Sequence, residues 1–226
     1  DSTLALGQAD GDSIVSLGDG GSAIATFAHP IINGDGADFA VFENSFSDTF
    51  LELAFVEVSS DGENYFRFPA TSYTQDEVQL DLGGMIDAIQ VNNLAGKYRG
   101  MYGTPFELEE LASEPDLDVN HITHIKLIDV VGSINPLYAS YDQHGNMIND
   151  PWNTPFPSCG FDLDAVGVIH SEITATNQLS AEAPFTTYPN PASDVVYIRM
   201  DDPKNASDAK ITLTDYTGRI ITTARN

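Results

Sequence analysis

The chain has little positive charge. Lysine and arginine together number 9 in 226 residues, against 34 aspartates and glutamates, which gives a formal net charge of −25 at pH 7. A surface of this sign repels nucleic acid and anionic lipid, so we expect neither as a partner. The single cysteine, Cys159, excludes an internal disulfide. No apolar run approaches the ~20 residues that a membrane-spanning helix needs, so membrane insertion is not expected.

Short apolar or alternating segments recur from residue 14 to residue 170, and clusters of Gly, Asn, Asp and Pro separate them. Alternation with a period of two between turn residues is typical of β-strands. The pattern predicts an all-β fold, a jelly-roll β-sandwich, in which segments 38–43 and 163–169 are strands close in space. One helix is expected at 104–114, where Thr104 could cap, Pro105 suits the first turn and Glu107 completes a capping box.

The composition and the apolar pattern of the sequence change after residue 170. A polar stretch rich in small residues follows, without apolar periodicity, and it is typical of a linker. We therefore expect a jelly-roll domain at 1–172, a linker at 173–184 and a small β-sandwich at 185–226. About forty residues bury little core, so this last part is small.

Carboxylates gather near two of the expected strands. In GFDLDAVGVIH, Asp162 and Asp164 fall on the same strand face, and Asp38 shares a face with Ala40 and Phe42 in NGDGADFAVFEN. Like charges placed side by side at the rim of a sandwich are costly unless they are protonated or bridged by a cation. Calcium accepts irregular sets of oxygen ligands and would resolve both cases. The alternative is that these acids are solvated turn residues.

Two glycine- and proline-rich loops, 92–106 and 150–160, hold aromatic rings beside polar groups. Such side chains line ligand pockets and glycan platforms, although they also plug the ends of a core. The candidate ligand-binding residues are Asn93, Lys97, Tyr98, Arg99, Tyr102 and Trp152. No nucleophile elbow, phosphate loop or dinucleotide motif occurs, so we expect no enzyme. A hydrolase using paired carboxylates is the weaker alternative.

The end of the chain resembles a known export signal. The pieces that carry the resemblance are Tyr188-Pro189-Asn190-Pro191, the strand at 195–198, and Thr217-Gly218-Arg219. They are similar to the C-terminal sorting domain of Bacteroidota proteins exported by the type IX secretion system. The resemblance implies export across the outer membrane to the cell surface or beyond, with the secretion machinery as a partner. We expect the sorting domain to be incomplete, because the closing strands and basic terminus of the family are not matched.

Residues 14–170 resemble bacterial cell-surface proteins through SLGDGGSAIATF, NGDGADFAVFEN, GTPFEL and GFDLDAVGVIH. VEVSSDGENYFRF is also similar to a strand pair of discoidin-like, galactose-binding jelly rolls, in which calcium is commonly structural. The resemblance favours calcium over solvated turns and implies a surface module that captures a glycan or another extracellular ligand. A structural or adhesive surface protein and a corrinoid-capture protein are the alternatives. The expected calcium ligands are Asp35, Asp38, Glu43, Asp162 and Asp164.

Overall fold

The chain divides into two compact units, residues 1–174 and 175–226. The computed structural model describes residues 3–155, 159–172, 185–188, 195, 197–200, 210–214 and 220–225. The linker predicted at 173–184 lies outside these described residues.

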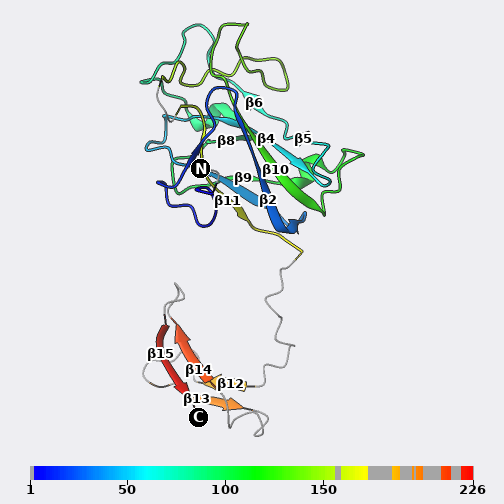
Figure 1. Cartoon of the computed structure of the whole chain (residues 1–226), viewed down its shortest axis with the longest axis vertical. Coiled ribbons are helices and arrows are strands. Elements are labelled where there is room, and N and C mark those ends of the chain that lie inside the picture. Colours follow the sequence, from blue (N-terminus) through cyan, green and yellow to red (C-terminus); the bar gives the residue numbers. More distant parts are fainter. Residues whose placement is uncertain are drawn as a thin grey trace. The chain divides into compact units, whose positions relative to one another are not determined.

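The first unit consists of strands and two short 3-10 turns (Figure 1). The strands are β1 (Val15–Ser16), β2 (Ser22–Ile31), β3 (Phe39–Glu43), β4 (Ala54–Ser59), β5 (Phe66–Arg67), β6 (Thr71–Ser72), β7 (Val91–Asn92), β8 (Leu94–Ala95), β9 (Thr104–Phe106), β10 (Ile122–Asp129) and β11 (Asp162–Val168). The 3-10 turns are η1 (Ala88–Gln90) and η2 (Leu108–Leu111).

Two antiparallel sheets form the body of this unit. One has the strand order β1-β11-β3-β9, and the other has the order β2-β10-β4-β5 with β8 beside β4. A minor pair joins β6 to β7. Figure 1 shows β2, β10 and β4 side by side. The predicted all-β fold and β-sandwich are confirmed, and the finer jelly-roll topology stays a prediction.

The larger of two hydrophobic clusters lies between the two sheets, and a smaller one includes Phe55 of β4 and Leu94 of β8. In β3, Phe39 and Val41 are buried in alternation with less buried neighbours, and Ile125 and Leu127 of β10 meet them from the other sheet. Alternation of this kind turns one apolar face inward on each sheet. Phe39 stacks on Phe106 with ring centroids 5.3 Å apart, and Phe68 adds a third ring. This packing holds β9 firmly against β3.

The central pair of the first sheet joins β3 to β11. Val41 lies opposite Val166, and Phe39 lies opposite Val168. The prediction that segments 38–43 and 163–169 are neighbouring strands is therefore confirmed. The register shifts between Leu163 and Ala165, so Glu43 lies opposite Leu163, next to Asp162.

The helix predicted at 104–114 is wrong. Residues 104–106 form the edge strand β9, which pairs with β3 so that Thr104 lies opposite Val41 and Phe106 opposite Phe39. Only the single turn η2 follows, and the capping side chain expected from Glu107 makes no capping hydrogen bond. Proline is tolerated on an edge strand, and burial of Phe106 outweighs the local helical signals.

The second unit is described through two strand pairs. β12 (Phe185–Tyr188) pairs antiparallel with β13 (Tyr197–Met200), and β14 (Lys210–Thr214) pairs antiparallel with β15 (Ile220–Arg225). Both pairs follow from alternating, β-branched segments.

Candidate functional site

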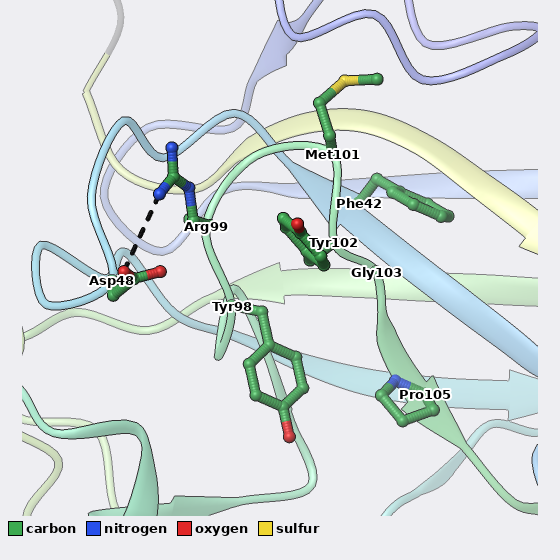
Figure 2. A pocket seen from close by; sticks show the side chains of 8 residues that line it. All are labelled: Phe42, Asp48, Tyr98, Arg99, Met101, Tyr102, Gly103 and Pro105. Atoms are coloured by element: carbon green, nitrogen blue, oxygen red, sulfur yellow. Dashed lines mark ion pairs between the residues drawn. The ribbon is translucent and has the colours of Figure 1, made fainter.

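A surface cavity of about 730 Å³ lies where the 98–105 segment crosses the outer face of β3 (Figure 2). We call it the aromatic pocket. It is lined by Phe42, Asp48, Tyr98, Arg99, Met101, Tyr102, Gly103 and Pro105.

Exposed apolar surface dominates the rim of the aromatic pocket. Tyr102 is 66% exposed, Met101 56% and Tyr98 39%, all large for apolar side chains. Phe42 contributes from β3, and a Cβ on Gly103 would come within 2.8 Å of its ring, so only glycine lets the loop lie this close. Arg99 faces Asp48 at 3.8 Å, an exposed pair that contributes little to stability. The cationic group is therefore available to a ligand.

Local backbone bonds fix the loop of the aromatic pocket. The Gly100 N–H donates to the carbonyl of Ser45 at 2.7 Å, and the Tyr102 N–H donates to the carbonyl of Arg99. Met101 has a φ of 70°, which is uncommon for a residue with a side chain. The loop is thereby tied to the 44–52 segment.

The structure brings Tyr98, Arg99 and Tyr102 together, as their common loop suggests, but not the other three predicted ligand residues. Asn93 is buried and donates to the carbonyl of Pro69 and to Glu110 Oε2, so it holds the framework. Lys97 stands over the Tyr98 ring at 5.7 Å without lining the pocket. Trp152 lies elsewhere: its indole N–H donates to Asp19 Oδ2 at 3.2 Å.

A second, smaller cavity of about 250 Å³ lies beside the start of β11. We call it the acid pocket. It is lined by Asn44, Ser45, Phe46, Phe50, Glu52, Leu82, Thr154 and Asp162.

Three buried oxygens at the acid pocket have no hydrogen-bond partner. They are Oδ1 of Asp162 and Oγ1 of Thr154, which both line it, and Oε1 of the neighbouring Glu43. Asp162 and Thr154 are each 5% exposed, and Glu43 is 1% exposed. Buried polar atoms almost always have partners, so three orphans in one place call for an explanation.

The carboxyl groups around the acid pocket hold protons more tightly than usual. Burial, and then the charges of Glu52 and Asp162, raise the pKa of Glu43 to about 8. Burial, and then the charge of Asp162, raise the pKa of Glu52 to about 8. Burial also raises the pKa of Asp162. Desolvation disfavours the charged form of all three groups, and acidic neighbours disfavour it further at Glu43 and Glu52.

Two further acids extend this negative region. Asp129, at the end of β10, accepts N–H bonds from Phe161 at 2.7 Å and Gly20 at 2.9 Å, yet burial raises its pKa to about 7. Asp150 accepts from the Leu53 N–H at 3.0 Å, and burial followed by the charge of Asp129 raises its pKa well above the usual range. Asp129 and Asp150 therefore accept hydrogen bonds from backbone N–H groups. At the acid pocket, by contrast, Asp162 and Glu43 each have an oxygen without a partner.

The five predicted calcium ligands occupy different surroundings. Asp35 is exposed. Asp38 is fully buried and accepts bonds from the N–H groups of Gly34 and Leu108, both at 2.7 Å, and contacts His170 Nδ1 at 2.8 Å. Asp164 accepts from the N–H groups of Asp10 and Gly11. Only Glu43 and Asp162 meet, at the acid pocket. Calcium at the predicted set stays a prediction.

In the described part of the chain, no three histidine, cysteine or acidic side chains converge so that they could hold a metal ion by themselves. Any cation there would need neutral oxygens as well. Sequence reasoning missed Glu52 and Thr154, because neither stands in an acidic motif. The available signal for Glu52 was an acid between two leucines at the start of the apolar run LELAFVEV.

The comparisons with known proteins concern the second unit, which is described through two strand pairs. Residues 186–226 match the family described as the secretion system C-terminal sorting domain. This supports the predicted Bacteroidota-type secreted protein, which is exported to the cell surface or the extracellular space and engages the type IX secretion machinery through this tail. No curated protein and no solved structure matches the chain. The described residues contain no helix that is long and apolar enough to cross a membrane.

Proposed function

We propose that the first unit is a binding module that captures a neutral extracellular glycan in the aromatic pocket. The observation that carries the proposal is the pairing of two exposed tyrosine rings, Tyr98 and Tyr102, around a hollow backed by Phe42. Exposed aromatic surface of this kind is retained where a ligand covers it.

The chemistry of the aromatic pocket suits a sugar. Tyrosine rings offer flat apolar faces to the C–H surfaces of a pyranose, and their hydroxyls stay free for hydrogen bonds. Arg99 brings donors and Asp48 brings acceptors to the same rim. A few convergent polar groups on an apolar surface give orientation and specificity.

The charge of the chain narrows the class of glycan. With a net charge of −25, the protein repels uronic, sialylated and sulfated sugars at long range. Arg99 alone at the rim does not reverse this, since it already faces Asp48. Neutral oligosaccharides are therefore the expected ligands, and the proposed function contains no catalytic step.

Binding of the full chain to neutral and acidic oligosaccharides, and to a corrinoid, tests the proposal by calorimetry. We expect binding to a neutral glycan, with Tyr98→Ala and Tyr102→Ala each weakening it about tenfold or more. Tyr73→Ala is the matched control, because Tyr73 is 71% exposed but lies outside the aromatic pocket. Glycan binding that survives both pocket changes would place the ligand outside the aromatic pocket and overturn the proposal. No glycan binding at all would favour a structural or adhesive surface protein. Capture of the corrinoid alone would favour the cofactor-capture hypothesis.

A further inference from the structure

The acid pocket gathers carboxyl groups that form no ion pair with a basic side chain of the described residues. The ion pairs in that part of the chain engage Asp38, Asp48, Glu57 and Glu172. Glu43, Glu52 and Asp162 are absent from them. An unpaired buried carboxylate is costly unless it takes up a proton, so the pocket either stays protonated or binds a cation from solution.

The free oxygens favour a cation as the occupant. Ionised carboxylates are acceptors only, and Thr154 can turn a lone pair of Oγ1 toward a cation in the pocket. The orphan oxygens of Asp162 and Thr154 are each on side chains more than nine-tenths buried that line the cavity. Thr154 carries no charge, so its orphan hydroxyl is evidence separate from the acidic cluster.

The ligand chemistry points to a hard cation. The polar groups that line the acid pocket are carboxylates, hydroxyls and one amide, with no imidazole or thiolate among them. Such oxygen sets suit calcium and magnesium, whereas zinc and copper prefer nitrogen and sulfur. Magnesium demands near-ideal octahedral geometry, but calcium accepts six to eight irregular ligands, including water. A small hollow with scattered oxygens fits calcium better.

We propose that the acid pocket binds a calcium ion through the carboxylates of Glu52 and Asp162 and the hydroxyl oxygen of Thr154. Asn44 lines the same hollow and brings a further neutral oxygen to it. Two carboxylates with neutral oxygens and water satisfy the ion without a third acidic ligand. Glu43 is not among the lining residues, but it lies opposite Leu163, next to Asp162, and its Oε1 is also without a hydrogen-bond partner.

This site differs from the one that the sequence suggested. Asp162 is a ligand in both, but Asp35, Asp38 and Asp164 take no part, and Glu52 and Thr154 are new. The inference is independent of the proposed glycan site, because the two pockets share no lining residue.

The test is calcium binding by the full chain, followed by calorimetry and by the melting temperature in calcium and in chelator. We expect a rise of about 5 °C at a hundredfold excess of calcium over its dissociation constant. Glu52→Gln and Asp162→Asn should each weaken binding about tenfold or more, because they remove ligand charge. Thr154→Val should weaken it less while keeping the shape of the side chain. Asp35→Asn is the matched control and should leave binding unchanged.

Proton release gives a readout that needs no variant. Carboxylate ligands bind the ion in their deprotonated form, so calcium binding should release protons and the measured heat should depend on the ionisation enthalpy of the buffer. A melting temperature and a heat signal that do not respond to calcium would overturn the proposal. So would binding that both Glu52→Gln and Asp162→Asn leave intact.

Discussion

Asp38 Oδ2 accepts a hydrogen bond of 2.7 Å from the backbone N–H of Leu108, seventy residues further along the chain. Its other oxygen accepts from the Gly34 N–H and lies 2.8 Å from His170 Nδ1. One buried carboxylate thus joins the turn before β3, the start of η2 and the end of β11. Asp38, which the sequence suggested as a metal ligand, thus acts as a clamp, by which we mean that its side chain holds three backbone segments together.

Replacing Asp38 should be among the more damaging changes in the first unit. Asp38→Ala leaves two N–H donors without their acceptor, and each such loss costs about 1–3 kcal/mol when the donor is buried. We expect a fall of about 3 kcal/mol or more in the free energy of unfolding, measured by urea denaturation. Asp35→Ala, three residues away and exposed, should change it by less than about 0.5 kcal/mol. Equal effects would contradict the clamp.

The strands could be predicted from sequence because their signal is local. Alternation of apolar residues in FAVFE and LDAVGV indicates which side chains face the core. These two segments form β3 and β11, which pair as predicted. The helix at 104–114 failed for the opposite reason. Its capping signals are genuine but weak, and the stacking of Phe106 on Phe39, which no local pattern encodes, decides the conformation.

The two candidate sites also differ in whether their residues are close together in the sequence. Tyr98, Arg99 and Tyr102 belong to one loop, so their closeness in space could be predicted from the sequence. The acid pocket draws Glu52, Thr154 and Asp162 from three distant segments. Only the folding of the sandwich brings them together, and the roles of Asp38 and Asp164 as acceptors of backbone N–H groups equally depend on distant partners.

The free energy of unfolding of the metal-free protein, measured in chelator, should fall as pH rises. The pKa of Glu43 and of Glu52 is about 8 in the folded protein, against 4.5 for an ordinary glutamate, so the folded state binds more protons between these values. The contribution of these two protonated carboxyls to the free energy of unfolding is therefore complete below pH 4.5 and is lost as pH rises through about 8. The melting temperature in chelator should decrease from pH 5 to pH 9.

Glu52→Gln should flatten this decrease, because the amide stays neutral throughout. Glu63→Gln, an exposed change of the same kind, should leave the slope as it is. A melting temperature in chelator that is constant or rises over this range would show that these carboxyls are not buried as described.

The first unit should fold without the sorting tail. The buried apolar residues of the described chain lie between Ile31 and Ala165, and the boundary of the first unit by internal contacts falls after residue 174. A domain with its own core usually folds alone. Residues 1–174 produced alone should therefore keep the far-ultraviolet circular dichroism of a β-sandwich and the melting temperature of that unit in the full chain. A loss of cooperative unfolding would contradict this expectation.

Calcium in the acid pocket should also steady the aromatic pocket. Ser45 lines the acid pocket, its N–H donates to Glu43 Oε2 at 2.7 Å, and its carbonyl accepts the Gly100 N–H at 2.7 Å. Ordering the 44–52 segment should therefore make opening of the Gly100 hydrogen bond less frequent.

Hydrogen exchange with and without calcium measures this directly. The Gly100 amide should exchange several-fold more slowly when calcium is bound, whereas the Gly145 amide, which donates to Asp142 in another turn, should not change. Glu52→Gln should abolish the difference at Gly100. If the ion slows both amides equally, its effect is on global stability. If it slows neither, the two pockets are not coupled.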